Sequence, residues 1–297
     1  MKNFIYLVQG QAKMLQNPLY VNLKNRTDID TVLLTYDEPL EGAIFLPNST
    51  WAQGRNRLQE EALKGDYRYY IFLDDDLCFV NGNFALFEKQ LLKYNPAVAM
   101  PVFVPKTAHT VLGIGIPYNG KFCMPFKYQL CRLGDAQLMA VHKDVILDRL
   151  IAPLQTQFDN ISWWFTSSTQ QLLIFNLYPD TTLQFNNIAV ENGLNREYPN
   201  NKFKHIQKEW LARQFIEPVY DPRVYIINLC SRPGIQRLFK SGLKKELSLK
   251  YIKTYTRTLW DTWRYKRSEN HQFREDKIRN VLQADSELLQ QHLIANR

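Results

Sequence analysis

Three consecutive carboxylates follow a hydrophobic run in the first third of the chain. The run is Tyr69–Leu73, and the acids are Asp74, Asp75 and Asp76. Adjacent carboxylates repel one another, so they cannot be buried unless a cation or water reaches them. Along an extended chain Asp74 and Asp76 share one face, and Asp75 points the other way. Hard cations such as Mg²⁺ and Mn²⁺ prefer carboxylate oxygens and bind through one or two of them plus substrate phosphates. We therefore expect a metal site here, with a solvated acidic turn as the alternative.

A basic segment lies shortly before these acids in the sequence. Residues 50–53 read Thr-Trp-Ala-Gln, a capping box that predicts a helix start, and Arg55, Asn56 and Arg57 fall in its first turns. In a sheet of parallel strands, helix N-termini lie on the same rim as the carboxyl ends of the strands. These side chains are therefore expected to face the three acids, where a guanidinium suits an anionic diphosphate. Surface charge is the alternative for Arg55 and Arg57.

The elements that must position these residues alternate between short apolar runs and helical stretches. A helix is expected at Phe84–Tyr94, ended by Asn95 and Pro96. Continuous apolar runs are typical of parallel strands covered on both faces. The predicted fold class is α/β, with a mixed, mostly parallel sheet flanked by helices. The expected strands are Phe4–Val8, Thr31–Tyr36, Ala43–Leu46, Tyr69–Leu73, Ala97–Val104, Gln137–His142 and Leu183–Val190.

The net positive charge of the chain comes entirely from its C-terminal segment. Residues 232–297 hold 15 Lys and Arg against 7 Asp and Glu, which equals the whole net charge of +8. Apolar residues recur there every four positions from Ile235 to Trp263, as in an amphipathic helix. We expect a domain over residues 1–231 and a basic helical extension over 232–297. The extension is expected to dock on the domain or to rest on an anionic membrane surface.

Composition excludes several classes of protein. The 297 residues are 45% hydrophobic and 22% charged, which is ordinary for a globular chain and excludes intrinsic disorder. No apolar run approaches the roughly 20 residues that cross a bilayer, and the N-terminus does not resemble a signal peptide. The 4 cysteines have no zinc or disulfide-scaffold spacing, so they are expected as reduced thiols of a cytoplasmic protein.

The basic helix and the acidic strand end together resemble a known family. The carrying residues are Gly54–Arg57, Glu61-Ala62, Gly65–Tyr67 and Ile71–Asp76, with 19 residues from Arg55 to Asp74. They resemble the nucleotide-sugar-binding half of GT-A glycosyltransferases with an Asp-x-Asp motif, family 2-like and of the bacterial polysaccharide type. Residues 137–145 are similar to the later strand and helix start on the acceptor side of such enzymes.

The resemblance implies an activity and its partners. The chain would transfer a hexosyl or N-acetylhexosaminyl group from a nucleoside-diphosphate sugar, with a UDP-sugar as the first expectation. The acceptor would be a hydroxyl of a glycan or a lipid-linked saccharide, and the cofactor Mn²⁺ or Mg²⁺. The expected location is the cytoplasm, with the inner membrane face as a place where the basic extension could rest. Nucleic acid is not expected as a partner of this enzyme.

The resemblance also implies roles for donor-site residues. Asp76 would ligate the metal directly, and Asp74 would contact the ribose or a metal-bound water. Asp75 would orient the metal or a sugar hydroxyl. Gln9 and Gly10, at the end of the first strand, would border the nucleoside.

The remaining expectations concern residues that match no fixed motif: Gln9, Gly10 and Asp37 are placed by position, and His205 and the candidate bases by what the resemblance implies. Asp37 would reach the base or ribose, and His205 could close the metal site from a C-terminal loop. Inverting members of the family place an acidic base at a helix start, where this chain has Trp163–Gln171 without any carboxylate. Since direct displacement by a hydroxyl needs a proton acceptor, the candidate bases are Asp159, Asp135 and Glu191, in that order. Trp163 and Trp164 are expected in the core, with sugar stacking as the alternative.

Other functions fit the same residues less well. A phosphatase with an aspartate nucleophile places a similar motif on its first strand and follows it with Thr or Val, whereas Cys78 follows here. A nucleotidyltransferase carries a glycine-rich basic loop after its first strand, for which Val8–Lys13 is a poor match. The alternative from another class is a non-enzymatic adaptor that binds a membrane surface or RNA through the basic C-terminal helix.

Overall fold

The computed structural model describes residues 2–103, 110–111, 116–117, 128–130, 136–147, 153–154, 156, 158–178 and 181–193. Two candidate site residues, Asp135 and His205, lie outside the described residues, and so does the basic extension over 232–297.

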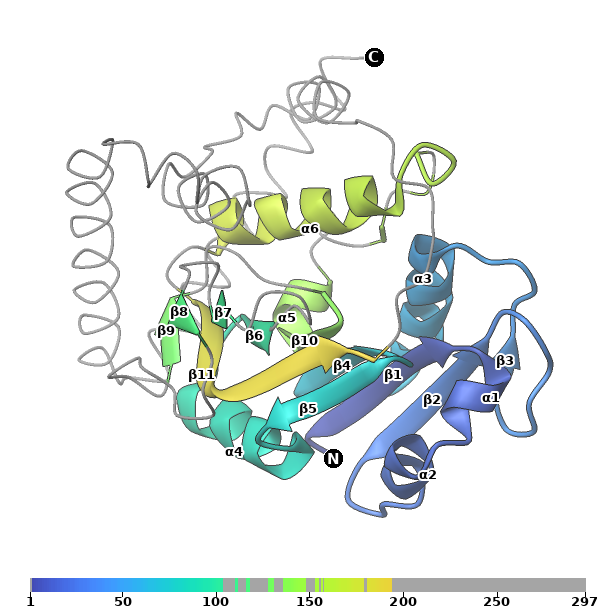
Figure 1. Ribbon diagram of the computed structural model, residues 1–297, viewed down its shortest axis with the longest axis horizontal. Helices are drawn as coiled ribbons and strands as arrows, with labels where there is room; N and C mark the ends of the chain where they lie inside the picture. Colours follow the sequence, from blue (N-terminus) through green and yellow to red (C-terminus); the bar gives the residue numbers. More distant parts are fainter. Residues whose placement is uncertain are drawn as a thin grey trace.

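A nine-stranded sheet organises the described residues (Figure 1). Its order is β3-β2-β1-β4-β10-β6-β11-β5, and β9 pairs with β11. Six strands run in one direction, while β10, β5 and β9 run against it. The prediction of a mixed, mostly parallel sheet is thus confirmed. The strands are β1 Phe4–Gly10, β2 Asp30–Thr35, β3 Ile44–Phe45, β4 Tyr69–Asp74, β5 Leu77–Asn81, β6 Val98–Phe103, β9 Tyr128–Leu130, β10 Leu138–His142 and β11 Thr182–Asn192.

Helices cover both faces of this sheet. The described helices are α1 Ala12–Leu15, α2 Pro18–Lys24, α3 Trp51–Ala62, α4 Phe84–Tyr94, α5 Lys143–Ile146 and α6 Trp163–Leu177. Figure 1 shows α2 and α4 below the sheet, and α3, α5 and α6 above it. Strand β1 shows the consequence, because Tyr6 and Val8 join the lower core while Ile5 and Leu7 join the upper one. Burial on both faces explains the unbroken apolar runs in the sequence.

The seven predicted strands all form, with ends shifted by one or two residues. Strand β5 was not predicted, because the short edge strand Leu77–Asn81 follows the acidic turn directly and its side chains are mostly exposed. Strand β9 and the small sheet of β7 Thr110–Val111 and β8 Ile116–Pro117 were also missed, since two or three residues give no periodicity. In the described part of the chain no helix has the length and apolarity to span a membrane.

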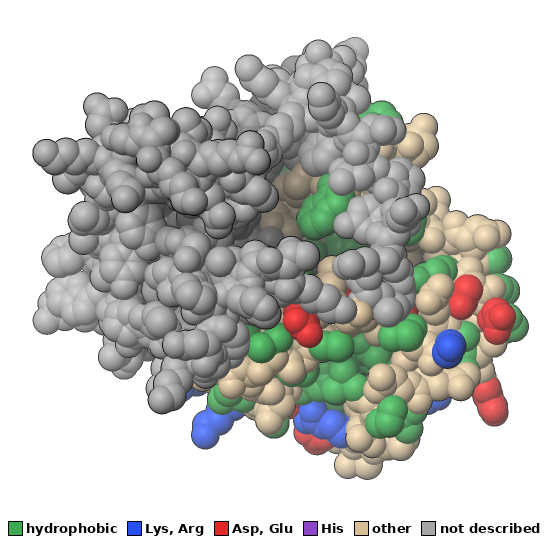
Figure 2. Space-filling view, in the orientation of Figure 1, with side chains coloured by type: hydrophobic (Ala, Val, Ile, Leu, Met, Phe, Trp, Pro, Cys, Tyr) green, Lys and Arg blue, Asp and Glu red, His purple; other side chains and the backbone are tan. Residues whose placement is uncertain are grey.

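Charges of both signs are spread over the described residues. On the face shown in Figure 2, acidic and basic side chains are scattered among hydrophobic and neutral ones. This agrees with the sequence, in which residues 1–231 carry 22 charges of each sign. The described surface in that view therefore offers no single-sign patch for nucleic acid or membrane.

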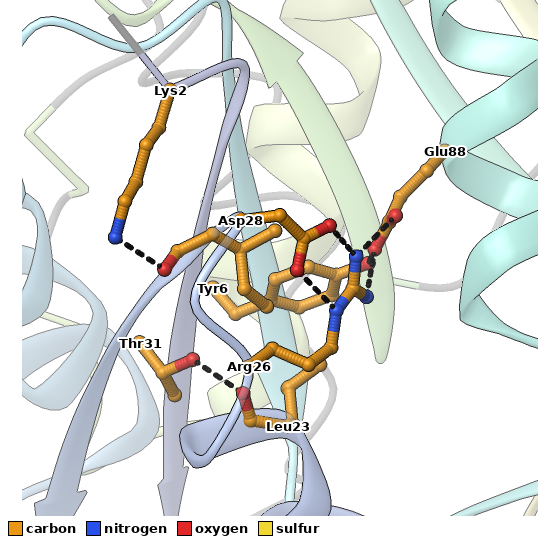
Figure 3. A network of polar contacts seen from close by, with 8 residues as sticks. Lys2, Tyr6, Leu23, Arg26, Asp28, Thr31 and Glu88 are labelled. Atoms are coloured by element: carbon orange, nitrogen blue, oxygen red, sulfur yellow. Dashed lines mark hydrogen bonds and ion pairs between the residues drawn. The ribbon is translucent and has the colours of Figure 1, made fainter.

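A partly buried ion pair joins α4 to the connection between α2 and β2 (Figure 3). Arg26 donates from Nη1 and Nη2 to the Glu88 carboxylate at 2.7 and 2.9 Å, and it also grips Asp28. The Tyr6 hydroxyl donates to Glu88 Oε1 at 2.6 Å. Burial, helped by the neighbouring Glu88 charge, raises the pKa of Tyr6, so its hydroxyl stays a donor. The network joins α4, β1 and the connection between α2 and β2.

Replacing Arg26 with alanine should lower the free energy of unfolding by about 2–4 kcal/mol, because the buried Glu88 then loses its cation. Urea unfolding of Arg26→Ala measures this loss. Arg57→Ala is the matched control, since Arg57 pairs only with Glu60 and Glu61 on the surface of α3, where ion pairs add little. Equal midpoints for the two variants would show that the network does not support the fold.

Candidate functional site

The three acidic residues stand at the carboxyl end of β4, and the chain gives each carboxylate its own partners. Asp74 is the last residue of β4, and Asp75 and Asp76 form the turn into β5. Arg55 Nη2 donates to Asp74 Oδ1 at 2.7 Å. The Trp51 indole N–H lies 3.2 and 3.3 Å from the two Asp74 oxygens. Asp74 is therefore held by a cation and a neutral donor from the first turns of α3.

Asp75 points away from Asp74 and supports the loop after β1. Its side chain is buried, and Oδ2 accepts from the Gln11 backbone N–H at 2.8 Å. Gly10 lies so close that a Cβ there would stand 2.1 Å from the Asp75 Cβ. The Asp75 carboxylate therefore holds the loop after β1.

Asp76 is contacted by residues next to β10 and β11, whereas Asp75 is contacted by the loop after β1. Gln137 Nε2 lies 3.3 Å from Asp76 Oδ1 and 3.4 Å from the Glu191 carbonyl oxygen. The Gly193 N–H donates to the Asp76 carbonyl. These contacts join the acidic turn to the start of β10 and the end of β11.

Helix α3 begins where the sequence predicts and delivers Arg55 to the acidic turn. Thr50 and Gln53 make both hydrogen bonds of the capping box. The Arg55 guanidinium lies between Trp51 and Phe72, at 4.8 and 5.0 Å from their ring centroids. Arg55 is only 2% exposed. The guanidinium charge of Arg55 therefore contacts Asp74 from the interior of the protein and does not reach the surface.

Burial acts against this ion pair. Desolvation raises the pKa of Asp74, and the neighbouring Arg55 charge works in the opposite direction. The Nε and Nη1 atoms of Arg55 are buried and find no hydrogen-bond acceptor among the described residues. The buried Arg55 guanidinium therefore fixes the position of Asp74 and offsets part of the negative charge of its carboxylate.

The other two residues of the basic segment do not face the acids, contrary to expectation. Asn56 bonds the backbone of Leu154 in both directions, at 2.9 Å through Nδ2 and 2.7 Å through Oδ1. Arg57 pairs along the helix with Glu60 and Glu61. The reason is helical geometry: neighbouring positions point about 100° apart, so only one of three consecutive side chains can reach the acids.

The loop after β1 is bound by carboxylates from two other loops. The Ala12 N–H donates to Asp37 Oδ1 at 2.9 Å, next to the bond from Gln11 to Asp75. These two consecutive N–H groups are therefore already used and are not available to a phosphate cradle of the nucleotidyltransferase kind. Gln9 is also placed at this end, opposite Asp74 in the parallel register, with its amide oxygen against Gly54.

The candidate bases lie on two different elements. Asp159 accepts hydrogen bonds from the hydroxyls of Thr50 and Thr166, which join the start of α3 to α6. Burial raises the pKa of Asp159, and these hydroxyls act in the opposite direction. Glu191 lies near the end of β11, beside Cys78 in the ladder. Trp164, in the first turn of α6, is 39% exposed, so its expected place in the core is wrong.

A metal would find part of its ligand set here. The described residues contain no group of three or more His, Cys, Asp or Glu able to hold an ion by themselves. Asp76 and Asp74 supply carboxylate oxygens, and Mg²⁺ or Mn²⁺ commonly takes only one or two of these and completes its shell with phosphate and water. The residues present thus fit a cation held jointly with a diphosphate and do not fit a closed protein cage.

Sequence reasoning missed three residues that shape the site. Trp51 and Gln137 contact the acids directly, while the Tyr20 hydroxyl donates to the Asp74 carbonyl at 3.0 Å from α2. Burial raises the pKa of Tyr20, so it stays a donor. Trp51 carried a signal, because it occupies the first helical position at the predicted rim. Tyr20 and Gln137 carried none, since their roles depend on tertiary contacts.

Comparison with known proteins gives no family for this chain. No family model and no curated protein matches it. Among solved structures it is similar to A197 from STIV, at 14% identity and a TM-score of 0.42, over 68% of this chain and 92% of that one. It is also similar to S. aureus TarS in complex with UDP-GlcNAc, at 9% identity and a TM-score of 0.47, over 97% and 92%. A third is GalNAc-T7 with UDP, GalNAc and Mn²⁺, at 10% identity and a TM-score of 0.47, over 70% and 48%.

Gly10→Ala should destabilise the protein by about 2 kcal/mol or more, because its Cβ would overlap the Asp75 Cβ, which cannot move without the backbone. Gly54→Ala is the matched control. Its Cβ meets the end of the flexible Gln9 side chain at 2.5 Å, and alanine favours the helix. Thermal unfolding of both variants measures the difference, and an unchanged midpoint for Gly10→Ala would contradict the close packing of the loop on Asp75.

Proposed function

We propose that the chain is a metal-dependent glycosyltransferase of the GT-A type. It transfers a sugar from a nucleoside-diphosphate sugar, first of all a UDP-sugar, to a hydroxyl of a glycan or a lipid-linked saccharide. The observation that carries this proposal is the pair Asp74 and Asp76 at the carboxyl end of a central parallel strand, each fixed by its own partners. That end of an α/β sheet is where ligands bind.

The residues of the chain have distinct parts in this proposal. Asp76 and Asp74 would hold Mn²⁺ or Mg²⁺, which supplies positive charge to the departing diphosphate. Arg55 keeps Asp74 in place from behind, and Asp75 and Asp37 fix the loop that would border the nucleoside. Charge that is fixed before the reaction stabilises a developing negative charge without reorganisation.

A direct displacement also needs a group that removes the proton of the acceptor hydroxyl. Asp159 is our first candidate, because its raised pKa brings it closer to the neutral range in which a base works well. Asp159 accepts a hydrogen bond from Thr50, and the next residue in the chain, Trp51, contacts Asp74. Glu191 and Asp135 remain the other candidates.

The protein should bind a nucleoside diphosphate only in the presence of a divalent cation. Thermal shift with UDP, GDP, CDP and dTDP, each with Mn²⁺ and with EDTA, measures this. At a free ligand concentration 100-fold above Kd the stabilisation should be about 2.7 kcal/mol. Asp76→Asn should abolish the shift, whereas Asp66→Asn should keep it, since Asp66 is exposed and forms a long ion pair with Lys143, at 4.0 Å.

Two outcomes would contradict the proposal. The first is a Mn²⁺-dependent shift that survives in Asp76→Asn, which would remove the metal from the acidic turn. The second is a folded protein that shifts with no nucleotide. In that case the favoured function is the adaptor that acts through the basic extension, and binding to anionic vesicles and to single-stranded RNA would separate its two forms.

Asp159→Asn should lower the transfer rate about 100-fold or more, as loss of a general base does, and should leave the fold intact. Burial raises the pKa of Asp159, so transfer by the unmodified protein should fall with decreasing pH from a higher value than an ordinary aspartate gives. The free energy of unfolding changes in the opposite direction. It falls as the pH rises from the ordinary pKa of an aspartate through the raised pKa of Asp159, because the folded protein holds that proton more tightly than the unfolded chain does. The pH–rate profile and urea unfolding measure the two effects.

Thr166→Val is the matched control for this variant, because it removes one hydrogen bond to Asp159 and leaves the carboxylate in place. It should keep most of the activity. If Asp159→Asn transfers sugar at the normal rate and with the same pH profile, Asp159 only joins α3 to α6, and the base lies elsewhere.

A further inference from the structure

One buried glutamine contacts both halves of the proposed metal site. Gln137 is 2% exposed and directly precedes β10. Its carbonyl accepts from the Asp74 N–H at 3.0 Å. Its side-chain Nε2 faces Asp76 Oδ1 at 3.3 Å and the Glu191 carbonyl at 3.4 Å. A single residue therefore links the end of β4, the acidic turn and the end of β11.

The contact with Gln137 falls on the acid that follows the strand. Asp74 is the last residue of β4, whereas Asp76 lies in the turn after it, and the Gln137 amide reaches the Asp76 carboxylate from the start of β10. The backbone of Gln137 is held by its bond to Asp74, and its buried side-chain amide lies against two acceptors, the Asp76 carboxylate and the Glu191 carbonyl.

The donor is also suited to a metal ligand. Gln137 is neutral, so its hydrogen bond orients the Asp76 carboxylate and leaves the negative charge in place. Arg55 does the opposite to Asp74, because a cation 2.7 Å away offsets part of that charge. Neutral donors that hold ligating carboxylates commonly change metal affinity 10–100-fold when they are removed.

We propose that Gln137 is a positioning residue that orients Asp76 for the divalent cation and ties this orientation to the end of β11. The inference rests on the proposed function, because it concerns the same metal site. It makes Asp76 the stronger ligand of the pair and Asp74 the weaker one.

The test is the affinity of the full chain for Mn²⁺, alone and with UDP, measured by calorimetry on Gln137→Met. Methionine keeps the length and apolar stem of the side chain and removes the donor. We expect the Kd for Mn²⁺ to rise about tenfold or more. Gln137→Asn is the second variant in case the first does not fold, and its shorter amide should fall short of Asp76 with the same direction of change.

Gln90→Met is the matched control. Gln90 is also buried, and its Nε2 donates to Asn187 Oδ1 at 2.6 Å, between α4 and β11. It should lose thermal stability as Gln137→Met does and keep the Kd for Mn²⁺ unchanged. A role of Gln137 in packing alone would give the two variants the same result.

The outcomes separate the inference from the function on which it rests. If the unmodified protein binds Mn²⁺ and UDP while folded Gln137 variants bind Mn²⁺ equally well, the inference is wrong and the proposed function stands. If the unmodified protein binds neither, both are wrong. A raised Kd in the Gln137 variants, with Gln90→Met unchanged, supports both.

Discussion

The ion pair between Arg55 and Asp74 is the interaction on which the arrangement of the site depends. It joins the first turns of α3 to the end of β4 at 2.7 Å, with the guanidinium enclosed by Trp51 and Phe72. A buried pair of this kind pays a large desolvation penalty and gives little net stability, but removing one partner leaves a buried charge without compensation. Its value here therefore lies in position: the pair holds the capped N-terminus of α3 at the acidic rim.

Three adjacent carboxylates are tolerated because the fold separates them. Asp74 faces a cation from α3, Asp75 faces backbone from the loop after β1, and Asp76 faces a neutral amide from the residue that precedes β10. Each contact comes from a different part of the chain, so the turn is held from three sides. Gly10 and Gly193 allow this crowding, because both lie against the turn at distances where a Cβ would collide.

Much of the fold could be predicted from the sequence, and less of the site could. The strands were recognisable because both faces of the sheet are covered, which leaves runs such as Phe4–Val8 apolar throughout. The start of α3 was recognisable because a capping box is a local signal. The bonds of Asn56 to Leu154, 98 residues away, and of Gln137 to Asp76, 61 residues away, leave no local trace. The same holds for Asp159, whose position depends on Thr50 from a distant helix.

The charges of the site argue for a ligand that brings its own cation. Arg55 is the cation that the described residues place on the acidic turn, and it is directed at Asp74 from the buried side. Backbone N–H groups and neutral amides can orient Asp75 and Asp76, but they do not cancel a full negative charge. A diphosphate alone would be repelled by this rim, whereas a divalent cation between phosphate and carboxylate reverses the sign of the interaction. In the proposed function, this change of sign is the physical reason why the site would take a metal–diphosphate complex in place of a free anion.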